Sequence, residues 1–290
     1  MLRNFMRSLL DYILVLLFAA AAIVLHAIMP SPGATMDTSV FDSVLVKKFG
    51  FPAVASGYFV ILFLHILSVI KVFAVKSDIG KWKTGCCIGM AFALLYLGGM
   101  QEIMISASPL TEYGLDFVLY ELFLGLGDAV PAFLMCVLLC MLHCVPSADV
   151  RGEKIFCKEN DIRIIGIACA FFLWRMFGYV TGIVDNEMSI YPVPVVIWTY
   201  IFGIVIGLGY CLINFSINDR GRKVVRLFLT IGINWIWFNC YIGLIAAHTF
   251  LFMVLRSGLD VLAILAGSIL AEVLIRKFEV TGGLDNINGE

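Results

Sequence analysis

Long apolar stretches alternate with short polar connections along almost the whole chain. A helix of about 20 apolar residues crosses the roughly 30 Å of hydrocarbon in a bilayer. Segments that are apolar on every side suit lipid rather than water. The pattern predicts an all-α, polytopic integral membrane bundle of eight transmembrane helices. The expected segments are Leu9–Met29, Ala53–Val75, Gly85–Ala107, Asp116–Cys144, Arg163–Val184, Val193–Phe215, Val225–Ala247 and Leu251–Ile275.

Basic residues in the connections predict how the chain is threaded. Only Lys47 and Lys48 lie on one side, while Arg175 and Arg256 fall inside apolar segments. The other sixteen of the twenty Lys and Arg residues lie on the opposite side. Cytoplasmic connections carry the basic excess, so we expect both termini in the cytoplasm and a location in the cell (inner) membrane. The sixteen basic residues on the expected cytoplasmic side are Arg3, Arg7, Lys71, Lys76, Lys81, Lys83, Arg151, Lys154, Lys158, Arg163, Arg220, Arg222, Lys223, Arg226, Arg276 and Lys277.

Composition agrees with this picture and narrows the partners. Hydrophobic residues make up 61% of the chain and charged residues 14%, far from the one-quarter charged usage of soluble domains. The lipid bilayer is therefore the expected partner. The formal net charge is −1, and the uneven distribution of basic residues reflects insertion, so we expect no nucleic-acid partner.

The first apolar segment has two interpretations. Arg3 and Arg7 precede an apolar run that ends near Ala27, which is also the pattern of a cleaved secretory signal. The run reaches about 20 residues, longer than a signal core, and we therefore favour an uncut transmembrane helix. The charge of the following loop does not separate the two interpretations.

No connection is long enough for a separate soluble domain, so residues 1–290 are expected to form one membrane domain. Two weak similarities suggest a four-plus-four duplication of residues 1–145 and 160–277, a layout found in some transporters. The strings Leu126–Val130 and Gly258–Leu262 are alike, and Pro52 and Pro194 open similar segments. Apolar sequences match easily by chance, and the duplication stays an open alternative.

Small residues recur at four-residue spacing, which lets helix backbones approach closely in lipid. We expect these positions to form seams within one chain rather than a dimer contact; the oligomeric state stays open. A further stripe on the last segment should face the bundle interior. The spaced residues are Gly85, Gly89 and Ala93, Gly178 and Gly182, and Gly203 and Gly207; the stripe is Arg256, Asp260, Ala263, Gly267 and Ala271.

Ionisable residues inside the apolar segments are the best functional candidates, because each one costs free energy there. At about 1.5 Å rise per residue, six of them fall in the outer half of the membrane, and His248 lies at a similar depth. Glu272 lies near the cytoplasmic end, within reach of Arg276. The candidate substrate-binding residues are Glu102, Glu121, Asp128, Arg175, Arg256, Asp260 and His248.

Two arrangements of these residues are expected. Glu121, Asp128 and Arg175 should meet inside the bundle, and Arg256 and Asp260 are i,i+4 partners on one helix. Pro131 should loosen the helix beside Asp128. These outer-half ionisable residues have two possible roles. Their carboxylates pair with Arg175 and Arg256 and hold the helices in register, or they line a water-accessible cavity. Because acids outnumber arginines four to two, we favour a cavity that binds a cation, a proton or water.

Nine cysteines raise the question of a metal. Cys136, Cys140 and Cys144 share a helix face beside His143, but no CxxC or paired Cys/His spacing supports a site, and buried cysteine usually packs as a small apolar residue. We expect no metal and no cofactor.

Three functional classes remain. A transporter or permease would bind a small cationic or protonated solute at the outer acids. A membrane-embedded enzyme would use an acid and a histidine, with arginine holding a phosphate or carboxylate. A non-enzymatic regulatory or immunity-type protein would need only its surface and would have fully paired charges. Transport leads narrowly, and the sequence leaves open whether the protein is an enzyme.

Overall fold

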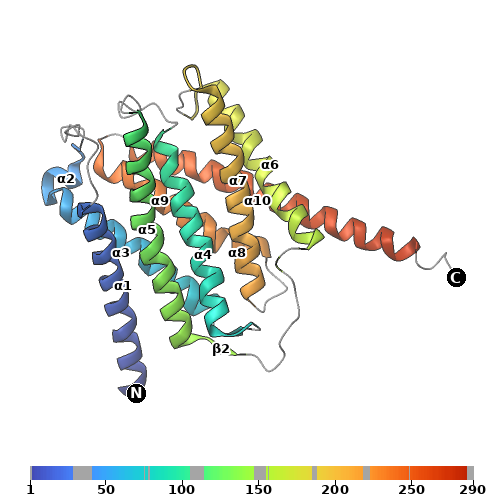
Figure 1. Ribbon diagram of the computed structural model, residues 1–290, viewed down its shortest axis with the longest axis horizontal. Helices are drawn as coiled ribbons and strands as arrows, with labels where there is room; N and C mark the ends of the chain where they lie inside the picture. Colours follow the sequence, from blue (N-terminus) through green and yellow to red (C-terminus); the bar gives the residue numbers. More distant parts are fainter. Residues whose placement is uncertain are drawn as a thin grey trace.

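The computed structural model describes residues 2–28, 41–74, 76–77, 79–104, 114–146, 155, 157–184, 188–217, 223–247 and 249–285. Within these ranges, the side chains of 2–5, 76, 103–104, 114–121, 146 and 279–285 are outside the description. The described part is almost entirely helical (Figure 1).

Eight helices are long and apolar enough to cross a membrane, which confirms the predicted number. The seventh crossing is composite, with α8 (Lys223–Leu227), a π-helical turn η4 (Phe228–Gly232) and α9 (Ile233–Ile245) running on from one another. The others are α1 (Leu2–Ile28), α3 (Phe51–Phe73), α4 (Lys81–Met100), α5 (Gly114–His143), α6 (Lys158–Thr181), α7 (Pro192–Ser216) and α10 (Phe250–Asp285).

Short elements join the crossings. Helix α2 (Val44–Phe49) precedes α3, and a 3-10 turn η2 (Gln101–Met104) ends α4. Strands β1 (Lys76–Ser77) and β2 (Val145–Pro146) form a parallel bridge. The bridge ties the segments that follow α3 and α5, so these two helices end at the same side of the bundle.

Two hydrophobic cores divide the bundle. One contains residues of α1, α3, α4 and α5, and the other is built mainly by α6, α7, α9 and α10 with Ala91 and Leu95 of α4. Helices α4 and α9 contact both groups. In Figure 1, α1, α5, α4, α7 and α6 stand side by side, and α10 crosses behind them and projects beyond the bundle. The cores follow the two halves of the chain, but the duplication stays a prediction.

Many large apolar side chains point away from the protein. Val180 is 81% exposed and Leu173 67% exposed on α6, and Leu262 is 62% exposed on α10. Such a surface is stable against acyl chains and costly against water, as expected of a multi-pass membrane protein.

Glycine lets several helices approach backbone to backbone. A Cβ at Gly85 would lie 2.7 Å from Cα of Val137 on α5, and one at Gly203 would lie 2.9 Å from Cα of Ala168 on α6. These seams are intramolecular, as predicted. The pair Gly178 and Gly182 is different: Gly182 has φ +73° and ends α6 in the left-handed conformation rather than forming a seam.

The segment before α2 is fastened to the end of α9. The Ser43 hydroxyl donates to the Leu244 carbonyl (2.6 Å), and the Ser43 N–H donates to the Ile245 carbonyl (3.1 Å). The N–H of Ala247 donates to Asp42 (3.0 Å), and this bond holds the pKa of the carboxyl below its usual value. These contacts satisfy helix-terminal groups that would otherwise be unpaired.

A paired charge cluster and an under-bonded carboxylate

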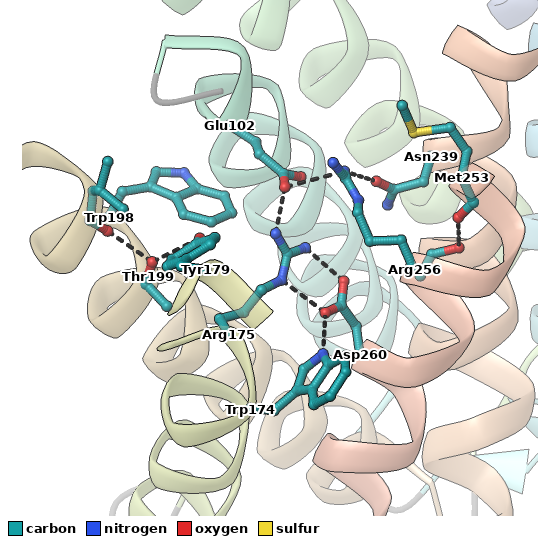
Figure 2. Close-up of polar contacts among 12 residues, drawn as sticks. Glu102, Trp174, Arg175, Tyr179, Trp198, Thr199, Asn239, Met253, Arg256 and Asp260 are labelled. Atoms are coloured by element: carbon teal, nitrogen blue, oxygen red, sulfur yellow. Dashed lines mark hydrogen bonds and ion pairs between the residues drawn. The ribbon is translucent and has the colours of Figure 1, made fainter. Parts of the chain in front are cut away.

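Arg175 of α6 lies at the centre of a buried charge cluster. Its side chain is 0% exposed. Its Nε donates to Oδ1 of Asp260 (2.7 Å) and its Nη2 to Oδ2 (2.5 Å), while Nη1 donates to Oε1 of Glu102 (2.5 Å). Figure 2 shows the guanidinium between the two carboxylates. Such a two-pronged contact is the strong form of an arginine–carboxylate pair.

Arg256 of α10 completes the cluster. Its Nη2 lies 3.0 Å from Oε1 of Glu102 and donates to Oδ1 of Asn239 on α9 (2.7 Å). Two acids therefore face two arginines, and the group is formally neutral. The expected i,i+4 pairing of Arg256 with Asp260 is wrong: Asp260 pairs with Arg175 across the helix interface, because the buried guanidinium reaches both carboxylate oxygens from α6.

Aromatic side chains enclose this cluster. The indoles of Trp174 and Trp235 each donate to Asp260 at 3.0 Å. The guanidinium carbon of Arg175 lies 5.2 Å from the ring centroid of Phe171 and 5.8 Å from that of Trp198, within the range of cation–π attraction. The cluster joins α4, α6, α9 and α10 and satisfies nearly all its donors; Arg256 Nε is left over among the described residues.

Asp128 of α5 lies apart from the cluster. The prediction that it meets Arg175 is wrong, since its ionic neighbour is His26 of α1, whose Nε2 is 3.4 Å from Oδ1. The residue is only 3% exposed, and Oδ1 makes no hydrogen bond of ordinary geometry with any described residue. Buried carboxylate oxygens are normally bonded, so this one is an exception.

The His26 ring shows where a proton must lie. Its Nδ1 is 2.7 Å from the carbonyl oxygen of Ala22. A carbonyl only accepts, so Nδ1 carries a hydrogen. In a neutral ring Nε2 then presents a lone pair to Asp128, which is repulsive if the carboxylate is ionised. A proton on the acid or on Nε2, or a cation between them, removes this repulsion.

Other polar groups lie near Asp128. The hydroxyls of Tyr58 and Tyr96 are within electrostatic range of its carboxylate. Tyr96 Oη and Asn234 Oδ1 are buried oxygens that also lack a hydrogen bond of ordinary geometry among the described residues. Pro131 has no N–H to give to the Gly127 carbonyl one turn earlier, so that oxygen has no intrahelical donor.

His65 of α3 supports the π-helical turn in the seventh crossing. Its Nε2 bonds to the Leu229 carbonyl (3.0 Å), so this nitrogen carries the hydrogen, and Nδ1 accepts from the Asn234 side-chain amide (3.1 Å). Both ring nitrogens are satisfied in the neutral form. π-Turns inside α-helices frequently mark functional sites.

Sequence reasoning missed a second buried acid, Asp11 of α1. It is 1% exposed, with Nζ of Lys71 2.7 Å from Oδ2 and Nε2 of His143 2.5 Å from Oδ1. A signal was present, because Asp11 lies inside an apolar segment just as the chosen acids do. Its position near the chain start drew no attention.

Oε1 of Glu272 accepts a hydrogen bond from Nε of Arg163 (2.7 Å), and Nη1 of Arg163 also donates to Oδ1 of Asn160 (2.8 Å). Glu272 therefore does not depend on Arg276 or water alone. The side chain of Glu121 and the whole of His248 lie outside the described residues. Within the described part, no group of three or more His, Cys, Asp or Glu side chains is arranged to hold a metal ion.

Comparisons with models of known protein families, with curated proteins and with solved structures found no match.

Proposed function

We propose that this multi-pass membrane protein carries a small cationic or protonated solute across the cell membrane, with both termini in the cytoplasm. Asp128 is the group that meets the cation or the proton exchanged for it. One observation carries the proposal: Asp128 Oδ1 is buried at membrane depth and has no hydrogen bond among the described residues. An acid in this state is costly, and a bound cation or proton removes the cost.

The charge cluster supports this choice by elimination. Glu102 and Asp260 are each in contact with arginine, so a cation there would have to displace a buried guanidinium. Asp128 has only an imidazole as ionic neighbour. The outer-half acids whose side chains are described thus divide into Glu102 and Asp260, which contact arginine, and Asp128, which does not.

The surroundings of Asp128 favour an organic ammonium ion. The ring of His26, the ionic neighbour of Asp128, lies 5.4 Å from the ring of Phe59, which lies 5.2 Å from the ring of Tyr58. Aromatic faces attract ammonium groups, while hydroxyl, amide and carbonyl oxygens accept their hydrogens. A carboxylate beside such rings matches an amine better than a strongly hydrated metal ion.

The two other classes fit less well. An enzyme that holds phosphate needs an uncommitted arginine, and both outer arginines contact carboxylates. A regulatory bundle predicts fully paired charges; the Arg175 cluster meets that expectation and Asp128 does not.

The test uses purified protein in detergent. Thermal unfolding is followed with Na⁺, K⁺, methylammonium, choline and guanidinium for the wild type, Asp128→Asn and the control Glu159→Gln, which neutralises an exposed acid. A ligand at 100 times its Kd stabilises by about 2.7 kcal/mol. We expect at least one organic cation to stabilise the wild type and the control but not Asp128→Asn, and to be taken up by proteoliposomes with the same dependence. Equal stabilisation of Asp128→Asn, or no effect of any of these cations on the wild type, contradicts the proposal.

A further inference from the structure

Helices α1 and α5 carry the same two ionisable residues at the same spacing. Asp11 and His26 are fifteen positions apart in α1, and Asp128 and His143 are fifteen positions apart in α5. A leucine precedes each histidine. At about 1.5 Å per residue, the aspartate and the histidine of each helix are roughly 22 Å apart along the axis.

The two helices are in contact and run in opposite directions, so each aspartate meets the histidine of the other helix. His26 faces Asp128 at one end (3.4 Å), and His143 faces Asp11 at the other (2.5 Å). Both contacts belong to a single antiparallel register. The arrangement is a local two-fold symmetry with its axis in the membrane plane, the kind of relation seen between inverted repeats in transporters.

Each pair is built to hold a proton. The hydrogen on His26 Nδ1 leaves one proton to be shared between Nε2 and Asp128. The short contact of His143 Nε2 with Asp11 places a ring hydrogen between this nitrogen and the carboxylate, so the second pair also joins an imidazole to a buried acid through a hydrogen. In both pairs the carboxylate is almost fully buried, at 5% and 1% side-chain exposure, while the imidazoles are 22% and 15% exposed. In each pair the imidazole is therefore the more exposed partner.

The seam between the pairs is apolar. At the same antiparallel register lie Val15 with Leu139 and Ala22 with Ala132, all of them buried. No polar side chain of the described seam bridges the roughly 22 Å between the pairs. A proton therefore exchanges with the surface nearest its own pair and does not pass from one pair to the other in this conformation.

We infer that His26–Asp128 and Asp11–His143 are two proton-binding sites that open to opposite membrane surfaces, one proton at each. Each site takes its proton from water and returns it to water. This inference rests on the proposed function, for which each site supplies a coupling proton at its own membrane surface.

The groups around the two sites make them unequal. Tyr58 of α3 and Tyr96 of α4 lie within electrostatic range of Asp128 in the outer pair, His26–Asp128. Both tyrosines carry no charge when protonated. Lys71 of α3 contacts Asp11, and Lys81 of α4 bonds the Met141 carbonyl nearby (3.4 Å); the thiols of Cys140 and Cys144 lie on the same stretch of α5. Positive charge stabilises the ionised carboxylate. Among the described residues, the carboxylate of the Asp11–His143 pair thus contacts a lysine and that of the His26–Asp128 pair does not.

Nitrogen NMR of protein labelled with ¹⁵N-histidine tests the inference directly, because the chain has only four histidines. Single substitutions assign the signals. We expect the wild-type His26 and His143 signals to show a shared proton, and the His65 signal to be that of a neutral ring. Asp128→Asn should remove the shared proton from His26 alone, and Asp11→Asn from His143 alone, while Glu159→Gln changes neither.

The exchanged variant His26→Asp with Asp128→His keeps the pair and should restore a shared-proton signal, which separates loss of the pair from misfolding. Once the signals are assigned, the wild-type titration decides the question: ordinary neutral-ring signals from His26 and His143 at every pH overturn the inference. Shared-proton signals in a protein that takes up no cation leave the two sites standing and contradict only the proposed transport.

Discussion

Replacing Arg175 with leucine tests whether the buried cluster holds the helices together. The substitution removes three donor contacts, two to Asp260 and one to Glu102. Glu102 keeps Arg256 at 3.0 Å, and Asp260 keeps two indole donors but no cation. Removing one partner of a buried ion pair lowers the free energy of unfolding by about 3–5 kcal/mol. Because Glu102 and Asp260 keep other donors, we expect a loss near the lower end of this range.

The magnitude is measured by unfolding in mixed detergent micelles and by melting. A loss of about 3 kcal/mol lowers the melting temperature by about 6–12 °C at the scaling of roughly 2–4 °C per kcal/mol for chains of 150–250 residues. Arg276→Leu, on the exposed end of α10, is the control and should stay within about 0.5 kcal/mol of the wild type.

A second variant makes the test specific to charge. Arg175→Leu combined with Asp260→Asn removes the stranded charge and keeps an acceptor oxygen for one of the two indoles, and Glu102 with Arg256 stays neutral. The double variant should be more stable than Arg175→Leu alone by at least about 1 kcal/mol, because neighbouring sites are not additive. The pairing is refuted if Arg175→Leu unfolds like the wild type, or if the double variant is as unstable as the sum of the two single variants.

Two further predictions concern packing and threading. Gly267→Ala places a Cβ 2.5 Å from the Gly166 carbonyl and should destabilise by about 1–3 kcal/mol, whereas Gly258→Ala on the same helix meets nothing within 4 Å and should be neutral or slightly stabilising in the same unfolding assay. In a background without the nine native cysteines, Lys47→Cys should react with an impermeant external thiol reagent and Lys83→Cys should not; the opposite result reverses the predicted orientation.

The sequence determined the number of crossings and their approximate limits. Length and apolarity are properties of each segment, and the need to satisfy every backbone group in lipid leaves only the helix as a solution. The seams at Gly85 and Gly203 were also predictable, because close approach in lipid depends on small residues at helical spacing. The structure moved most limits by a few residues, moved the start of α1 and the ends of α4 and α10 further, and added the short helix α2, which no hydrophobic pattern marks.

Only the tertiary structure decided which charges meet. Arg256 and Asp260 lie on one helix at a spacing that favours contact, yet Asp260 pairs with Arg175 and Arg256 with Glu102. The depth of a residue follows from counting along its own segment. Its partner depends on the rotation of each helix about its axis and on which helices are neighbours.

The same limit applies to the candidate site. Asp128 was identified from the sequence, but its separation from Arg175 and its contact with His26 come from the packing of α1 against α5. Asp11 and His143, unremarkable as single positions, become a pair because the equal spacing on two antiparallel helices brings both ends into register at once. That register is set by contacts between segments more than a hundred residues apart in the chain, where local pattern carries no information.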